Sequence, residues 1–448
     1  MARKVFISFL GTGNYVNCKY EFSDRDGVVS EPVRFIQEAI IKQVCVDWTK
    51  DDKIFIFCTG EAYDKNWVDE GHVDPSKPNK QLEDIEKVGL ETRLKNTQYW
   101  SLVEMHKIED GFDEKQVWSI FDEVYRHLRE GDELYFDVTH AFRSIPMFST
   151  ILFNYASFMK NIEIKSIQYG AFEKLGPSFK VKEEIPLENR IAPVLNLTEM
   201  IRLQQYTDIA SSFVTFGRVR KLSDTLKSEN LETNSVVRDV YNALESFDNA
   251  LLTNRISEIE AGKYMIAIKN SVKPIARKED IPTPIKDILR RLHNELNRFG
   301  FLPEKSYKNI EAAISWAKHF KMLPQAYTMG QEYIITLVVS LFEEHSPFTK
   351  DKDGKKNFRM FMSSICSIGD DDVKIKNYKG MLNQYPDVAD KLLKESLINE
   401  LRPFYADFGE KRNAVNHGKG DVAYKTLVEE FDRLYNKCLN IIKSNLSC

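Results

Sequence analysis

The first 185 residues alternate between short apolar runs and segments whose apolar positions have helical spacing. Continuous apolar runs are typical of strands that are buried on both faces of a parallel sheet. Strands are predicted at 4–10, 53–58, 132–137 and 163–169, and helices at 32–46, 114–129 and 146–159. This alternation predicts a mostly parallel sheet with helices on both faces, a Rossmann-like α/β architecture.

The pattern changes after Leu187. From Thr198 to the end of the chain, apolar positions recur with a helical period and few runs resemble strands. Helices are predicted at 198–216, 234–252, 284–299, 306–320, 324–342, 404–417 and 421–442. The chain is therefore predicted to have an α/β domain at 1–187 and an all-α region at 188–448. Two charged segments, 66–89 and 350–356, are predicted to be a mobile loop insertion and a solvated loop.

Small and polar residues follow three of the predicted strands, at the point where each strand ends. They are Gly11, Thr12, Gly13 and Asn14 after the first strand, Thr59 after the second, and Thr139, His140 and Arg143 after the third. Ligands of open parallel sheets bind in the crevice over the carboxyl ends of the strands. Glycines let backbone N–H groups approach an anion, and hydroxyl, imidazole and guanidinium groups can hold phosphates or base edges. These residues are therefore the candidate site for a phosphate-bearing ligand.

The first of these loops is neither of two common nucleotide-binding loops. Val16 stands where the dinucleotide fingerprint G-x-G-x-x-G has its last glycine, and no Gly-Lys-Ser/Thr follows as in a Walker loop. An enzyme that uses nicotinamide or ATP is therefore disfavoured. The alternative is a structural role, in which Gly11 and Gly13 make a tight turn and His140 and Arg143 bind backbone carbonyls.

Composition restricts the compartment and the charge available for ligands. The chain has 448 residues and a formal net charge of −4, so any contact with RNA requires a local basic patch. Its 6 cysteines include no C-x-x-C pair, which indicates neither a disulfide framework nor a zinc cluster, and no metal is expected. The apolar start is too short for a secretory signal, and the longest apolar stretch, 333–342, is about half of a membrane span. A cytoplasmic protein without membrane contact is expected.

The predicted helix 404–417 ends in Arg-Asn-Ala-Val-Asn-His, directly before Gly418. Arg412 offers a fork of donors to phosphate oxygens, and His417 can transfer a proton at neutral pH. Arg412 and His417 lie about 140° apart on the helix, whereas Asn413 and His417 share a face. His417 is expected to transfer the proton of the ribose 2′-hydroxyl or of the leaving 5′-oxygen. Arg412 is expected to stabilise the charge of the phosphorane, and Asn413 is expected to hold the substrate or the imidazole. Such cleavage of RNA needs no metal and leaves a 2′,3′-cyclic phosphate.

A structural explanation competes with this catalytic one. Arg412 could pair with Glu410 or another neighbour, and His417 could simply cap the helix. The remaining histidines show no paired spacing such as H-x-x-x-H, so no chemical role is expected for most of them; they are His72, His106, His127, His293, His319 and His345.

Motifs at both ends of the chain resemble those of a known family. Asp137-Val-Thr-His-Ala-Phe-Arg143 is similar to the Asp-x-Thr-His-Gly-x-Arg motif of CARF domains, the sensor modules of CRISPR-associated proteins, although Ala141 replaces the glycine. The Gly-Thr-Gly turn at 11–13 fits the same family. The segment 412–417 resembles the Arg-Asn-x-x-x-His motif of HEPN ribonucleases. The chain thus looks like a CARF–HEPN ribonuclease of type III CRISPR systems with a catalytic core at about 320–448, although residues 220–400 match less clearly.

The resemblance implies an effector that is quiet until cyclic oligoadenylate is made during viral infection. Cyclic tetra- or hexa-adenylate would lie across a dimer of CARF domains, held in each protomer by the strand-end loops. No cofactor is implied beyond this allosteric activator, and the substrate would be single-stranded RNA. The HEPN site would be composite, with Arg412 and His417 contributed by each chain of the homodimer.

Two other functions are alternatives. A CARF-containing transcription regulator would carry a basic recognition helix of the helix-turn-helix type, and no convincing one is seen. A ring nuclease would instead degrade cyclic oligoadenylate in the CARF cleft, where Thr12, His140 and Arg143 could hold a ribose 2′-hydroxyl in line.

Overall fold

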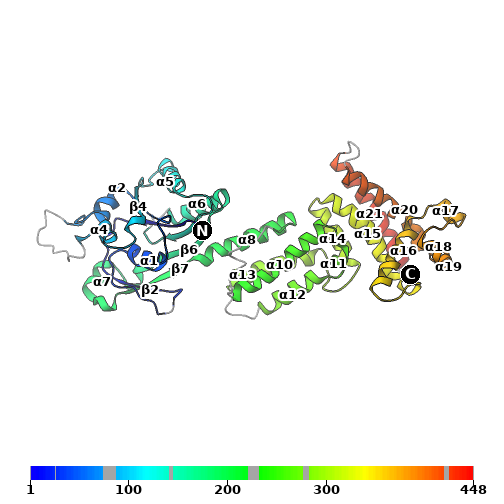
Figure 1. Ribbon diagram of the computed structural model, residues 1–448, viewed down its shortest axis with the longest axis horizontal. Helices are drawn as coiled ribbons and strands as arrows, with labels where there is room; N and C mark the ends of the chain where they lie inside the picture. Colours follow the sequence, from blue (N-terminus) through cyan, green and yellow to red (C-terminus); the bar gives the residue numbers. More distant parts are fainter. Residues whose placement is uncertain are drawn as a thin grey trace. The chain divides into compact units, whose positions relative to one another are not determined.

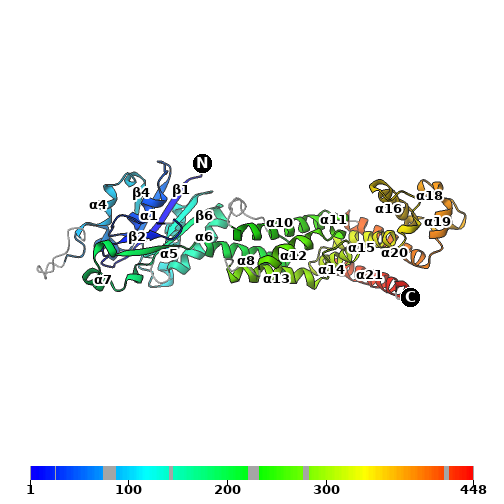
Figure 2. The same ribbon diagram turned by 90° about the horizontal axis from the view of Figure 1, so that it is seen from below.

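The fold is described from a computed structural model of the chain (Figure 1; Figure 2). The structure describes residues 2–25, 27–73, 87–140, 145–219, 232–275, 282–417 and 423–446. The chain divides into two compact units, Met1–Arg202 and Leu203–Cys448. The first unit is α/β, and the second is helical throughout its described part.

The first unit is built on a mixed, mostly parallel sheet of seven strands in the order β2-β7-β6-β5-β1-β3-β4. The strands are β1 Lys4–Leu10, β2 Lys19–Phe22, β3 Lys53–Cys58, β4 Val103–Lys107, β5 Glu133–Asp137, β6 Glu163–Gly170 and β7 Ile191–Asn196. β1 lies between β5 and β3 and is parallel to both, whereas β6 and β7 form an antiparallel pair. The predicted mostly parallel α/β sheet is confirmed.

Helices cover both faces of the sheet (Figure 1). The helical segments of this unit are α1 Ile36–Val44, α2 Gly60–Ala62, the π-helix η1 Tyr63–Trp67, α4 Leu90–Lys95, η2 Trp100–Leu102, α5 Glu114–His127, α6 Ile145–Lys160, η3 Phe172–Leu175, α7 Ser178–Glu184 and η4 Leu187–Asn189. α1 and α4 pack on one face with Phe6 of β1, and α5 and α6 pack on the other with Val5 and Ile7. Burial on both sides explains why the central strands are continuous apolar runs.

The sequence does not predict three strands, β2, β4 and β7. β2 has only 4 residues, and β4 is a half-exposed edge strand that includes charged side chains. β7 contains Pro193, which lowers its apparent strand propensity. Because β7 joins the sheet, the first compact unit extends to Arg202, beyond the boundary expected near residue 187.

The second unit is an assembly of helices, and the boundary between the two units falls within α8. Its helical segments are α8 Thr198–Phe216, α10 Glu232–Leu252, α11 Ile256–Glu260, α12 Lys263–Ile275, α13 Thr283–Arg298, α14 Lys308–His319, α15 Leu323–Leu341, η5 Glu343–His345, α16 Lys352–Ser367, α17 Asp370–Lys374, α18 Met381–Gln384, α19 Pro386–Leu392, α20 Ser396–Asn416 and α21 Tyr424–Leu446. The helices predicted for this half are confirmed, although α20 begins earlier than predicted and contains Pro403. α15 is buried along most of its length and packs against α14, α16 and α20. None of the described helices is both long and apolar enough to cross a membrane.

Two segments differ from the sequence prediction. Asn66 and Trp67 are buried in η1, so the predicted loop insertion does not begin at Asn66, and residues 74–86 lie outside the described residues. The segment 350–356 is a loop only at its start. The Asp351 carboxylate accepts a hydrogen bond from the N–H of Gly354 at 2.7 Å and caps α16, which begins at the next residue.

Candidate functional site

The loops after β1, β3 and β5 leave the sheet at one edge. In the parallel register, Leu10 lies opposite Cys58 and Ser8 lies opposite Asp137. The carboxyl ends of the three strands are therefore neighbours. Of the predicted site residues, the described ones that follow these strand ends are Gly11, Thr12, Gly13, Asn14, Thr59, Thr139 and His140.

Asn66 of η1 holds the loop after β1 in place. Its Nδ2 donates to the carbonyl oxygens of Gly11 at 2.8 Å and Gly13 at 2.9 Å. Its Oδ1 accepts from Nη2 of Arg34 at 3.3 Å and lies 3.1 Å from Nε2 of His72. Because Asn66 is fully buried, these contacts replace its hydrogen bonds to water. The shape of the Gly-Thr-Gly loop thus depends on a residue far along the chain.

The ring of His140 packs against the ring of Tyr15 in a tilted arrangement, with centroids 4.2 Å apart and planes at 32°. The Tyr15 hydroxyl fills the space beside Gly11, since a Cβ placed on Gly11 would lie 2.4 Å from the hydroxyl oxygen. Burial lowers the pKa of His140 to about 4 and raises the pKa of Tyr15 well above its ordinary value. Both rings are therefore uncharged at neutral pH. His140 is suited to stacking or neutral hydrogen bonding rather than to charge pairing with a phosphate.

Asp137, at the end of β5, is fully buried and organises the loop that follows it. Its Oδ1 accepts from the N–H and the hydroxyl of Thr139, at 3.0 and 2.6 Å, and its Oδ2 accepts from Oγ of Ser8 at 2.8 Å. Oγ of Thr139 in turn accepts from the N–H of Gly170 at 2.8 Å. Burial raises the pKa of Asp137, while the hydrogen bonds from Thr139 and Ser8 act in the opposite direction. The hydroxyl of Thr139 therefore has partners within the protein.

The remaining predicted residues of this edge have different environments. Thr59 is fully buried, and its hydroxyl accepts from the N–H of Ala62 at 3.3 Å as the cap of α2. Thr12 is half-buried and Asn14 is exposed. Arg143 lies outside the described residues. Thr59 thus supports its loop from inside, whereas Thr12 and Asn14 are accessible to a ligand.

Arg412 is oriented near the end of α20 by two amide oxygens. Its Nη1 donates to Oε1 of Gln331 at 2.9 Å, and its Nε and Nη2 donate to Oδ1 of Asn413 at 3.2 and 3.0 Å. Gln331, on α15, is buried and also donates to the carbonyl oxygen of Tyr405 at 3.4 Å. The partners found for Arg412 among the described residues are thus neutral groups rather than a carboxylate such as Glu410. Within the part of the chain that the structure describes, the positive charge of Arg412 is held in place without a neutralising carboxylate.

His417 is the C-cap residue of α20, which ends at Asn416, so the predicted helix end is confirmed. The N–H of His417 donates to the carbonyl oxygen of Asn413 at 3.0 Å, and the imidazole is exposed. The amide oxygen of Asn413 faces Arg412, so in this structure it orients the guanidinium. An exposed imidazole, an amide and an oriented guanidinium therefore share one helix end.

Gln331 and Asn66 are supporting residues that were not predicted from the sequence. Each supports a predicted site residue, but each is far from that residue in the sequence, at separations of 81 for Gln331 and Arg412 and 55 for Asn66 and Gly11. Gln331 did leave one usable signal, because a glutamine inside a largely apolar helical stretch needs a buried hydrogen-bond partner. Asn66 stands at the edge of a charged segment and left none.

Comparison with known proteins adds an independent finding. Residues 202–306, from α8 to the loop after α13, match the family model described as the second domain of CRISPR-associated protein MJ1674. The chain is also 25% identical over 348 residues to CRISPR-associated protein MJ1674 of Methanocaldococcus jannaschii. That similarity covers 70% of this chain and 50% of the relative, so the chain spans about half the length of the curated relative it matches. Together the two matches show that this chain is similar in sequence to CRISPR-associated protein MJ1674.

Proposed function

We propose that this chain is a CRISPR-defence ribonuclease whose helical unit cleaves single-stranded RNA when its α/β unit binds cyclic oligoadenylate. The observation that carries the proposal is the environment of Arg412, whose guanidinium is oriented by Gln331 and Asn413. A cation that is oriented but not neutralised can bind a phosphate and the charge that grows on it during cleavage. The exposed imidazole of His417 stands at the same helix end.

The proposed reaction is a transfer of phosphorus from one oxygen to another. An imidazole removes the proton of the ribose 2′-hydroxyl, which attacks the adjacent phosphorus as the bond to the 5′-oxygen breaks. The leaving 5′-oxygen takes a proton from a second group, which acts as the general acid. The products are a 2′,3′-cyclic phosphate and a 5′-hydroxyl. Arg412 stabilises the negative charge of the phosphorane that forms before the bond to the 5′-oxygen breaks. Since one His417 can serve only one of the two protons at a time, a homodimer that pairs two such helix ends would supply both.

The strand-end edge of the α/β unit is the proposed sensor. The loop with Thr12 and Asn14 is accessible at the surface and could follow a phosphate backbone. The neutral, half-buried rings of Tyr15 and His140 offer a surface for a purine or its hydrogen-bonding edge. The CARF and HEPN resemblance and the relationship to CRISPR-associated proteins support the same assignment.

A cleavage assay tests the proposal. Purified protein is mixed with a fluorescent single-stranded RNA and with cyclic tetra- or hexa-adenylate, and the initial rate is measured. RNA should be cut only when one of the two rings is present, and the fragments should carry a 2′,3′-cyclic phosphate. His417→Ala and Arg412→Ala should each lower the rate by roughly 100-fold or more. His293→Ala and Arg433→Ala, which change the same residue types elsewhere in the helical unit, should have little effect.

Other outcomes assign other functions. Cleavage that persists in His417→Ala, or that chelation abolishes while the protein still binds its messenger, contradicts the proposed chemistry. Consumption of the ring without cleavage of RNA would indicate a ring nuclease. Binding to DNA without either activity would indicate a transcription regulator.

A further inference from the structure

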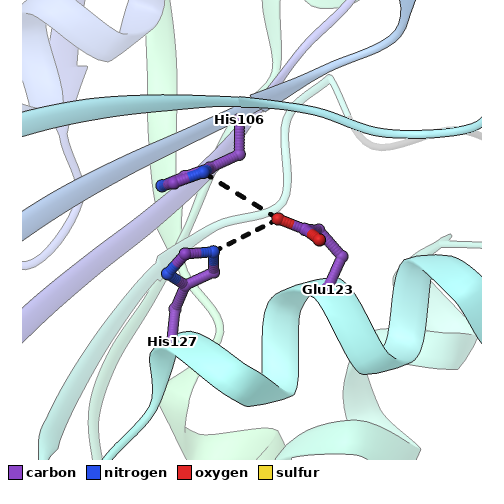
Figure 3. Close-up of side chains that lie close together, drawn as sticks. All are labelled: His106, Glu123 and His127. Carbon is purple, nitrogen blue, oxygen red and sulfur yellow. Dashed lines mark hydrogen bonds and ion pairs between the residues drawn. The ribbon is translucent and has the colours of Figure 1, made fainter.

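Three side chains that commonly bind metals meet on the face of the sheet that α5 covers (Figure 3). His106 comes from the edge strand β4, and Glu123 and His127 lie one turn apart on α5. One ligand atom from each side chain lies within 4.8 Å of the others. The two imidazole rings have centroids 3.9 Å apart. His106 and His127 belong to the histidines for most of which no chemical role was expected, because their spacing in the sequence is not paired and only the packing of strand and helix unites them.

The separations within this cluster suit a small cation. Oε1 of Glu123 lies 3.2 Å from Nε2 of His127 and 3.8 Å from Nδ1 of His106. Zinc bonds of about 2.0–2.1 Å with tetrahedral angles place neighbouring ligand atoms roughly 3.4 Å apart. Small rotations of these side chains would therefore place their ligand atoms at three corners of a tetrahedral site.

The groups around the cluster resemble the surroundings of a metal-bound imidazole. Nε2 of His106, the nitrogen turned away from Glu123, is buried without a hydrogen-bond partner among the described atoms and lies 3.8 Å from Oε2 of Glu104. Metal-binding histidines commonly donate their second N–H to a carboxylate. The rings of Phe55 and Phe57 pack against His106 at centroid distances of 5.7 and 5.6 Å, which restricts its orientation.

The guanidinium group of Arg126 contacts two of the three proposed ligands. Nη2 of Arg126 lies 2.7 Å from Oε1 of Glu123, and its Nε donates to Nε2 of His127 at 3.4 Å. The Arg126 side chain is 64% exposed, so it can turn into solvent without breaking the core. The arrangement attracts a cation, and Arg126 is the competitor that a metal ion would displace.

We propose that His106, Glu123 and His127 bind a first-row divalent metal ion, Zn²⁺ by the chemistry of the donor set, with the remaining position open to water. Two imidazoles and a carboxylate are ligands that zinc prefers, and most imidazoles are neutral near pH 7. The ligands come from β4 and α5, so a bound ion ties the outermost strand to the helix that covers it and stabilises the α/β unit. The site and Arg412 belong to different units, so this inference does not depend on the proposed function.

Metal titration of the full-length protein tests the inference. Chelator-treated protein is titrated with Zn²⁺ in competition with a colorimetric chelator. The wild type should bind one Zn²⁺ ion per chain. Each of the variants Glu123→Gln, His106→Ala and His127→Ala should bind Zn²⁺ at least tenfold more weakly than the wild type. Arg126→Gln should bind at least as tightly as the wild type, because the competing guanidinium is gone. His293→Ala should leave the affinity unchanged.

Thermal unfolding supplies a second readout that does not require the alanine variants to fold well. Saturating Zn²⁺ should raise the Tm of the α/β unit by several degrees in the wild type and in Arg126→Gln. Glu123→Gln keeps the size of the side chain but removes its charge, and it should lose this shift. Absence of binding in the wild type, or equal affinities and equal Tm shifts in Glu123→Gln, would overturn the proposal.

Discussion

Nη1 of Arg412 donates a hydrogen bond to Oε1 of Gln331, 2.9 Å away, although the two residues are 81 positions apart in the sequence. The bond joins the end of α20 to the buried interior of α15. The direction in which the guanidinium points therefore depends on how these two helices pack. A buried side chain on another helix can in this way orient the proposed catalytic group.

Replacing Gln331 should lower the rate of RNA cleavage. Hydrogen bonds to charged groups contribute about 1.5–3 kcal/mol, so Gln331→Ala is expected to slow cleavage by roughly 10- to 100-fold at saturating cyclic oligoadenylate. Gln331→Glu should slow it at least as much, because a carboxylate would pair with Arg412 and neutralise it. Gln325→Ala, on the same helix, serves as the control in single-turnover assays. Equal rates for all three variants would show that the bond has no catalytic importance.

Gly330→Ala should destabilise the helical unit by about 1–3 kcal/mol. A Cβ at this position would lie 2.6 Å from Cε1 of Phe408, a fully buried residue of α20. Gly369→Ala is the matched control, since its nearest neighbour there is Oδ2 of Asp372 at 4.0 Å. Urea unfolding should separate the two variants. Similar midpoints would mean that the helices can shift apart at low cost.

Asn66→Ala should weaken the binding of cyclic oligoadenylate by about tenfold or more. The variant removes the two hydrogen bonds that fix the carbonyl groups of Gly11 and Gly13, and with them about 1–3 kcal/mol of stability. Binding is measured with a labelled ring, and the exposed Asn189→Ala serves as the control. A variant that loses stability but binds the ring with unchanged affinity would place the ligand elsewhere.

The α/β unit should lose stability on mild acidification because of His140. Burial lowers the pKa of this imidazole from about 6.5 to about 4, so between these values the unfolded chain binds a proton that the folded chain does not. The free energy of unfolding should therefore fall as the pH drops from about 6.5 to 4, by at most about 3 kcal/mol from this group. Asp137, whose pKa is raised, acts in the opposite direction.

Comparison with His140→Gln isolates the contribution of the imidazole. The difference in unfolding free energy between the wild type and this variant should change with pH over that interval and level off above it. Chemical denaturation at several pH values measures the difference. A difference that is constant with pH would mean that His140 titrates normally in the folded protein.

Local sequence patterns predicted the central elements well. The apolar run of Lys4–Leu10 was predicted to be a strand buried on both faces, and its two sides do enter different core clusters. The end of α20 was also predictable, because a helical pattern stops there before Gly418. By contrast, the edge strand Val103–Lys107 has a half-exposed pattern, and local burial does not distinguish it from a loop.

What the sequence by itself determined is the division into an α/β part and a helical part, the buried central strands and longer helices, and which reactive residues share a helix end or follow a strand. Tertiary structure alone decided that Asn66 holds the loop of Gly11, that Gln331 directs Arg412, and that His106 meets Glu123 and His127. The reason is physical. Periodicity records the environment of each residue along its own element, whereas a contact between distant residues depends on strand order and helix packing, which arise only when the whole core assembles.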